Sequence, residues 1–168
     1  KQTGYTNVAL FGLDSRENDL GKGNRSDTII IASLNNDTKE VKLVSIYRDT
    51  LLELDDGSYN KANSAYSFGG PEGAVSLINR NLDMNIEKYV TVNFNALVDV
   101  IDAVGGLDLE LTHDEVVHMN NYCVETSKVT GKSYEKIEPE VEGTYHLNGV
   151  QAVSYSRIRY TEGGDFKR

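Results

Sequence analysis

The chain has 168 residues, of which 39% are hydrophobic, and a formal net charge of −9 at pH 7. A chain of this length and composition can bury one real core, so we expect a single domain over residues 1–168. The negative charge argues against nonspecific binding to nucleic acid, because polyphosphate backbones are attracted by a broad positive field.

Apolar segments in the first third of the chain predict three β-strands, at residues 7–13, 28–32 and 41–46. Turn residues at 35–38 separate the last two, which predicts an antiparallel hairpin. Residues 55–57 predict a further turn.

The middle of the chain predicts helices separated by glycine. A short helix is expected over residues 60–66, stopped by Gly69-Gly70, and Pro71 is suited to the first turn of the next helix. The apolar stripe of that second helix consists of Ala74, Leu77, Ile78 and Leu82. Residues 89–94 then predict a strand.

The last third begins with a helix over residues 96–104 that ends at Gly105-Gly106. Its inward side is expected to carry Leu97, Val100, Ile101 and Val104. Residues 107–111 predict an edge strand. Residues 113–142 predict a surface excursion with one short helix. Asn148 is expected to cap a final helix that runs towards Arg159. This order predicts an α/β fold with a mixed central β-sheet flanked by helices, an α/β/α sandwich.

Arginine and lysine are segregated in this sequence. Most arginines stand beside an acidic residue or another arginine, directly after an apolar segment, whereas most lysines lie in solvated turns. Arginine offers a planar fork of donors suited to phosphate oxygens, and lysine is a strongly hydrated point charge. The pattern indicates a site for phosphate or pyrophosphate.

Two aspartates are candidate metal ligands. Asp14 follows the first strand and Asp27 precedes the second, so an antiparallel pairing brings both to one edge of the sheet. Their carboxylates could hold Mg²⁺ or Mn²⁺ through oxygen. The alternative is that each aspartate caps a turn and pairs with Arg16 or Arg25.

The hairpin itself predicts a convergence of charged groups. Arg48 and Asp49 follow the return strand, whose end lies beside the start of its partner, near Arg25 and Asp27. Surface ion pairs are the alternative.

The C-terminal arginines form a further candidate group. Arg157 and Arg159 are expected to face one site if the helix ends near Ser156, and Arg168 would close that site. The alternative is a solvated basic helix end.

The histidines lack the spacing of metal ligands, and the lone Cys123 is expected to be a packed side chain. No apolar run reaches the roughly 18 residues of a transmembrane helix. Because Lys1-Gln2-Thr3 is not a natural start, we expect the chain to be a fragment, truncated at its C-terminus, of a longer parent protein.

The ordered motifs resemble the extracellular catalytic domain of the LytR-CpsA-Psr family. The resemblance covers nearly the whole chain and is carried by residues 7–16, Arg25-Ser26-Asp27-Thr28, Ser45 to Thr50, Lys61 to Tyr66, Gly69 to Glu72, Val92-Asn93-Phe94, Val104 to Asp108, Leu147 to Ala152 and Arg157-Ile158-Arg159. Tyr47 stands where the family usually has proline.

This resemblance implies a membrane-anchored phosphotransferase on the outer face of Gram-positive cells. Such an enzyme moves a teichoic acid or capsular glycopolymer from a polyprenyl-pyrophosphate carrier to a peptidoglycan hydroxyl, with Mg²⁺ or Mn²⁺ as cofactor. Arg25 and Arg48 would then be catalytic, and Asp49 is the candidate general base. The implied metal ligands are Asp14 and Asp27, and the implied pyrophosphate-binding residues are Arg25, Arg48, Lys61, Arg157, Arg159 and Arg168.

Three further expectations remain beside this one. Val98 and Ile101 either line a slot for the lipid or belong to an ordinary core. The enzyme could instead be a pyrophosphatase, with water as acceptor. A non-catalytic module that binds cell-wall polysaccharide is the alternative of a different class, with modest support from the ten tyrosines.

Overall fold

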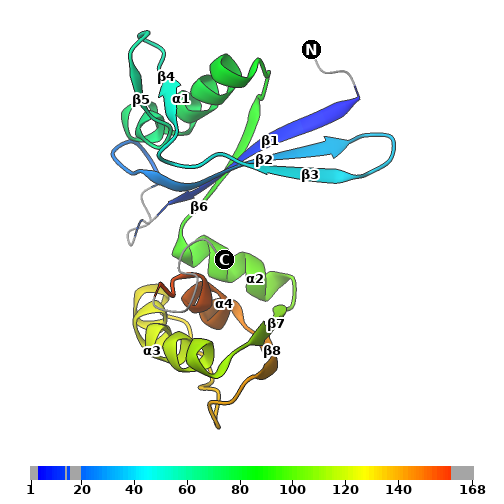
Figure 1. The fold of residues 1–168 in the computed structure, drawn as a ribbon, viewed down its shortest axis with the longest axis vertical. Helices are drawn as coiled ribbons and strands as arrows, with labels where there is room; N and C mark the ends of the chain where they lie inside the picture. The colour runs from blue at the N-terminus through cyan, green and yellow to red at the C-terminus, as the bar shows by residue number, and fades with distance from the viewer. Residues whose placement is uncertain (1–3, 14, 16–19, 160–168) are drawn as a thin grey trace. The chain divides into compact units, whose positions relative to one another are not determined.

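The computed structural model describes residues 4–13, 15 and 20–159. The chain divides into two compact units, residues 1–93 and residues 94–168, each with its own apolar core (Figure 1). That the chain forms one domain stays a prediction, and each unit is described by itself.

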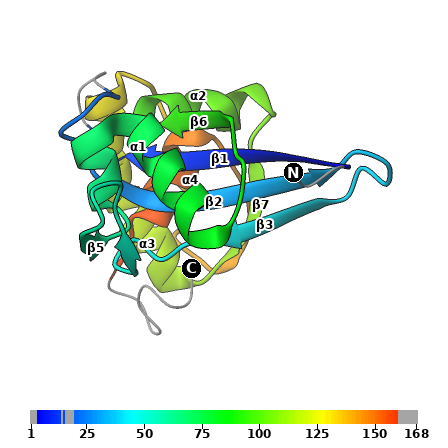
Figure 2. The same ribbon diagram turned by 90° about the horizontal axis from the view of Figure 1, so that it is seen from above.

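The first unit is built on a four-stranded sheet in the order β3-β2-β1-β6. These strands are β1 (Tyr5–Leu13), β2 (Ser26–Asn35), β3 (Val41–Ser45) and β6 (Lys88–Val92). β1–β2 and β2–β3 are antiparallel and β1–β6 is parallel, as the side-by-side strands in Figure 2 show. The predicted hairpin and the mixed sheet of an α/β fold are therefore confirmed.

Helix α1 (Ser64–Leu82) covers one face of this sheet. Its path is interrupted at Gly70, where φ is 68° and ψ is −160°, so the predicted break before Pro71 is confirmed. The buried side chains of α1 pack with alternate residues of β1 and β2, and this core includes Phe11, Ile29, Tyr66, Leu77 and Ile78. Leu82 was expected in the same stripe but is 45% exposed, since the helix ends there.

A second hairpin joins the sheet to α1. Its strands are β4 (Leu51–Glu53) and β5 (Tyr59–Lys61), and the predicted turn at residues 55–57 lies between them. The helix expected from residue 60 is wrong at its beginning, because Asn60 and Lys61 pair with β4 and the helix starts only at Ser64. Cross-strand pairing therefore outweighed the weak local helix propensity.

The second unit combines three helices with a two-stranded hairpin. Its elements are α2 (Phe94–Ala103), β7 (Leu107–Leu111), α3 (His113–Thr130), β8 (Gly143–Leu147) and α4 (Gly149–Ser156). The three helices share a core that includes Val98, Met119, Cys123 and Val153. The expected inward positions Val100 and Val104 are wrong, since they are 51% and 68% exposed.

Helix α3 replaces most of the predicted surface excursion. It begins with a capping box, in which Thr112 accepts from the Glu115 backbone and Glu115 accepts from the Thr112 backbone. It ends at Gly131 in the left-handed conformation. Its buried side includes polar Glu115, Asn120 and Thr126, which weakened the apolar periodicity of the sequence. Among the described residues, no helix combines the length and hydropathy that crossing a bilayer requires.

Candidate functional site

A β-bulge sets the position of Asp27. β1 and β2 pair regularly up to Gly12 and Thr28, but the next pair is Leu13 with Ser26, so Asp27 is an extra residue of β2. Such bulges bend a strand and redirect a side chain, often beside a functional site. Gly12 permits the close approach, because a Cβ there would lie 3.0 Å from the Cβ of Thr28.

Arg48 and Asp49 occupy the tight turn that follows β3. The pairing of β2 with β3 continues as far as the Ile46 amide, which donates to the Ile29 carbonyl at 2.9 Å. The turn is closed by the Thr50 amide, which donates to the Tyr47 carbonyl at 3.0 Å. Arg48 thereby reaches Asp27, and its Nη1 donates to Oδ1 of that carboxylate at 2.5 Å. The convergence predicted from hairpin geometry holds for this pair.

The β4–β5 hairpin adds a second cation. Lys61 ends β5, and its Nζ donates to Oδ1 of Asp49 at 2.6 Å. The other carboxylate oxygen of Asp49 lies 3.5 Å from Nε of Arg48. The four side chains therefore form a row of alternating charge, which we call the charge row: Asp27, Arg48, Asp49 and Lys61.

Backbone hydrogen bonds hold together the two segments that carry the charge row. The Asn63 amide donates to the Arg48 carbonyl at 3.0 Å, and the Ala62 amide donates to the Thr50 carbonyl at 2.8 Å. Together with the pairing of Leu51 and Lys61, these bonds hold the end of β5 against the turn. Main-chain bonds rather than ion pairs thus bring the charges together.

The pairing shifts two ionisation equilibria. The hydrogen bond and the attraction of Asp27, with a smaller contribution from Asp49, raise the pKa of Arg48. The hydrogen bond from Lys61, with the charges of Lys61 and Arg48, lowers the pKa of the Asp49 carboxyl below its usual range. Both shifts favour the charged forms of Arg48 and Asp49.

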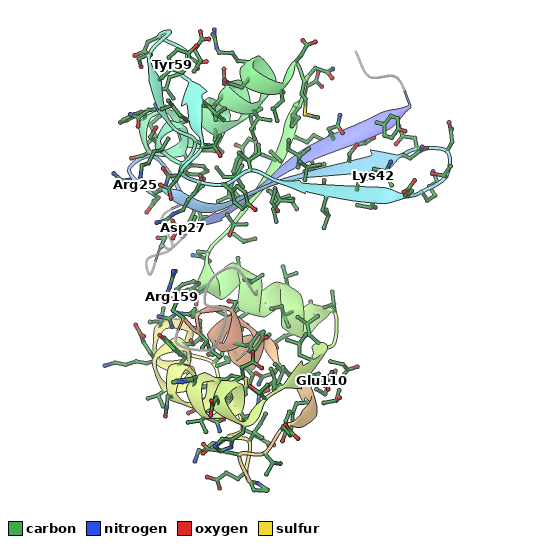
Figure 3. All side chains as sticks on the ribbon, in the orientation of Figure 1. Arg25, Asp27, Lys42, Tyr59, Glu110 and Arg159 are labelled. Atoms are coloured by element: carbon green, nitrogen blue, oxygen red, sulfur yellow. The ribbon has the colours of Figure 1, made fainter. Side chains whose placement is uncertain are left out.

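An open pocket of about 260 Å³ lies beside the row. Its walls include Asp27, Thr28, Ser45, Arg48 and Asp49. Arg25 lies at the same end of the sheet as Asp27 and opposite to Lys42, as Figure 3 shows. It is exposed and makes no hydrogen bond or ion pair with the residues that the structure describes. None of its five N–H donors is therefore taken up by that part of the chain.

Arg157 has a different environment, inside the second unit. Its guanidinium donates to Glu125 at 3.0 Å and to Thr126 at 3.1 Å, and its side chain is only 17% exposed. The same group lies 5.0 Å from the ring centre of Phe94 and 5.3 Å from that of Tyr122. Arg157 thus ties together α2, α3 and α4 by ionic, hydrogen-bond and cation–π contacts.

The remaining predicted residues have varied outcomes. Helix α4 ends at Ser156 as expected, but Arg157 keeps helical angles, while Arg159 is exposed. Asp14 and Arg168 lie outside the described residues, as does Arg16. Val98 and Ile101 belong to the core of the second unit, the ordinary alternative for these two side chains.

The side chains with no expected catalytic role are accounted for by packing and local bonds. Cys123 is buried, and this burial raises the pKa of its thiol. His146 bonds to Asp108 at 2.7 Å and to the Gly105 carbonyl at 2.6 Å. Within the described ranges, no group of three or more His, Cys, Asp or Glu residues is arranged to hold a metal ion.

The bond between Asp49 and Lys61 was not predicted from the sequence. The signal was present, because residues 51–53 and 59–61 flank the turn residues Asp55-Asp56-Gly57 at equal distance. Because residues 60–66 were predicted as a helix, Lys61 was not paired with a strand. Its contact with Asp49 could then not be predicted.

Clustered arginine, lysine and carboxylate groups at one end of a sheet are typical of the class of protein that binds phosphorylated ligands. The sequence matches the model of the LytR_cpsA_psr family over residues 1–168. The chain therefore belongs to the LytR-CpsA-Psr family.

Individual relatives agree with this assignment. Polyisoprenyl-teichoic acid–peptidoglycan teichoic acid transferase TagV of Bacillus subtilis is 38% identical over 165 residues, which cover 96% of this chain and 39% of that protein. The chain thus spans less than half the length of that curated relative.

Two solved structures are also similar. TagT of B. subtilis with bound octaprenyl pyrophosphate lipid has a TM-score of 0.67 at 26% identity, covering 94% of this chain and 58% of that one. Protein gbs0355 of Streptococcus agalactiae has a TM-score of 0.72 at 28% identity, covering 99% of this chain and 56% of that one.

Proposed function

We propose that this chain carries the catalytic site of a phosphotransferase that moves a teichoic-acid-type glycopolymer from a polyprenyl-pyrophosphate carrier to a hydroxyl of peptidoglycan. The observation that carries the proposal is the charge row with Arg25 beside it, at one edge of the sheet. Family membership, the teichoic acid transferase activity named for the TagV relative and the lipid bound to TagT support the choice of substrate.

The reaction is an in-line displacement at phosphorus. The oxygen of the acceptor hydroxyl forms a new bond to the phosphorus that carries the glycopolymer, and the bond from that phosphorus to the bridging oxygen breaks. Polyprenyl phosphate leaves with the bridging oxygen, and the hydroxyl proton passes to a base or to solvent. Arg25 and Arg48 stabilise the charge that spreads over the phosphoryl oxygens and the leaving phosphate.

Other residues of the site have supporting roles in this proposal. Lys61 contributes positive charge next to Asp49. Arg159 and Arg168 bind the pyrophosphate from the C-terminal part of the chain. Arg157 acts through its contacts with Glu125 and Phe94, which leave its guanidinium largely engaged.

A divalent cation fits the acidic members of the site. Oδ1 of Asp27 is bonded to Arg48, but its second oxygen has no hydrogen bond or ion pair within the described part of the chain. Hard cations such as Mg²⁺ prefer carboxylate oxygen, and Asp14 would be the second ligand. The cation would supply positive charge to the phosphate oxygens. Chelation of divalent ions should abolish transfer, and added Mg²⁺ should restore it.

The cellular setting follows from the same substrates. A polyprenyl carrier is held in a lipid bilayer and peptidoglycan lies outside it, so the proposed place of action is the outer face of the membrane. The proposed protein is membrane-anchored, and its partners are the lipid-linked glycopolymer and peptidoglycan.

The decisive experiment supplies a prenyl-pyrophosphate-linked teichoic acid precursor together with purified peptidoglycan and Mg²⁺. The proposal predicts a covalent adduct on peptidoglycan and equimolar release of prenyl phosphate. Release without adduct would identify a pyrophosphatase, and retained polymer without turnover would identify a polysaccharide-binding module.

A further inference from the structure

Asp49 contacts both cations of the charge row, and these are its side-chain partners among the residues that the structure describes. Lys61 donates to its Oδ1 at 2.6 Å, and Nε of Arg48 lies 3.5 Å from its Oδ2. A general base works best when its pKa is near the operating pH, because it must be free to accept a proton. A carboxylate that two cations share is held in the ionised form and is a weak base.

We propose that Asp49 is a positioning residue, which holds Arg48 and Lys61 in fixed orientation as a two-armed clamp for the phosphate oxygens of the substrate. This inference rests on the proposed function and assigns Asp49 a role other than the general base expected from the sequence. In this role the Asp49 carboxylate sets the orientation of Lys61 as well as that of Arg48.

The geometry of Arg48 supports the clamp. Two of its three guanidinium nitrogens are committed, Nη1 to Asp27 and Nε to Asp49. Its remaining nitrogen, Nη2, has no hydrogen bond with the described residues, so both of its protons are available. Fixing a planar group at two corners also fixes the direction in which the third corner points.

Exposure makes such fixing necessary. The side chain of Arg48 is 48% exposed and that of Lys61 is 61% exposed. Long side chains in solvent sample many rotamers, and a ligand that binds them must order them at a cost in entropy. Asp49 reduces that cost because it orders both side chains before the ligand arrives.

Simple charge counting predicts the opposite effect of losing Asp49. Asp49 is itself negative, so its removal raises the positive potential at the pocket and should strengthen the binding of an anion. If Asp49 positions Arg48 and Lys61, its removal should weaken that binding. The sign of the change therefore separates the two roles.

The experiment measures the affinity of the purified protein for inorganic pyrophosphate by calorimetry, for the wild type, Asp49→Asn and the control Asp56→Asn. Asp56 is also an exposed aspartate with a lowered pKa, caused by its bonds from Ser58, but it lies in the β4–β5 turn away from the row. Asparagine keeps the shape of aspartate and removes the charge. We expect Asp49→Asn to bind about tenfold more weakly and Asp56→Asn to bind as the wild type does.

Each outcome has a defined meaning. Equal or tighter binding by Asp49→Asn overturns the positioning role but leaves the proposed function intact. A wild type that does not bind pyrophosphate counts against the proposed function itself. Should Asp49→Asn lower the melting temperature, Asp49→Glu decides, because recovered binding supports the clamp and unrecovered binding overturns it.

Turnover provides a second readout. With the lipid-linked substrate, the positioning role predicts that Asp49→Asn mainly raises KM. A fall of about 100-fold in kcat with unchanged pyrophosphate affinity would instead assign Asp49 as the base and overturn the clamp.

Discussion

Arg48 and Arg157 show how one residue type can serve two purposes. Arg157 is 17% exposed, and its Nη1 and Nη2 donate to Thr126 and Glu125 beside two aromatic rings, so burial limits its access to a ligand. Arg48 is 48% exposed, and its Nη2 stays available beside a pocket. Sequence spacing alone treats both as phosphate-binding residues, because it reveals neither exposure nor partners.

Arg48→Ala should reduce transfer activity strongly. The substitution removes the guanidinium to which we assign stabilisation of the phosphoryl group, and loss of one such preorganised donor typically costs about 100-fold in kcat. Arg80→Ala is the matched control, because Arg80 pairs with Glu53 and Asp55 outside the row. Steady-state kinetics of both variants give the comparison, and a similar loss in both would contradict a specific role of Arg48.

Cys123 should be unreactive in the folded protein. Its side chain is fully buried, and desolvation raises the pKa of the thiol, which leaves less of the reactive thiolate at any given pH. Titration with a thiol reagent at pH 8 should show slow labelling under native conditions and one fast-reacting thiol in denaturant. Rapid native labelling would contradict the packing described for α3.

At the scale of elements, the sequence predicted the β2–β3 hairpin well and α3 poorly. Residues 28–32 and 41–46 are strongly apolar and flank turn residues, so local pattern and tertiary pairing agree. Helix α3 buries Glu115, Asn120 and Thr126 among its apolar residues, which obscured the helical period. The capping box at Thr112 and Glu115 was the signal that could have located its start.

The contacts of the candidate site also differ in how far the sequence could predict them. The contact of Arg48 with Asp27 follows from hairpin geometry and was predictable. That of Lys61 with Asp49 requires the short β4–β5 hairpin, whose three-residue strands have little pattern of their own. The predicted metal ligand Asp14 stays a prediction, since it lies outside the described residues.

Helix α4 begins so close to α2 that only glycine fits. A Cβ on Gly149 would lie 2.3 Å from the Val98 carbonyl oxygen and 2.8 Å from the Val98 Cα, both of them backbone atoms. Gly149→Ala should therefore lower the free energy of unfolding by about 2 kcal/mol or more. Urea unfolding measures the change, and Gly143→Ala in β8 is the control, because its Cβ would meet only ordinary contacts.

For the whole molecule, charge restricts the range of polyanions that the protein can bind. A net charge of −9 repels a long nucleic acid, while a small phosphate group needs only the local positive charge of Arg25, Arg48 and Lys61. We expect the dissociation constant for a 30-base-pair DNA, about the length of a repressor site, to be weaker than about 10⁻⁴ M at physiological salt. Fluorescence anisotropy measures it, and a micromolar value would contradict the argument.

The extra residue in β2 has a consequence for attempts to transplant this site. Along a regular strand, successive side chains point to opposite faces of the sheet. One inserted residue exchanges these faces for the strand residues that precede it. A scaffold that copied the identities of Ser26 and Asp27 onto an uninterrupted ladder would turn the buried side chain of Ser26 to the other face of the sheet. Transfer of the chemistry therefore requires transfer of the irregularity, together with the glycine opposite it.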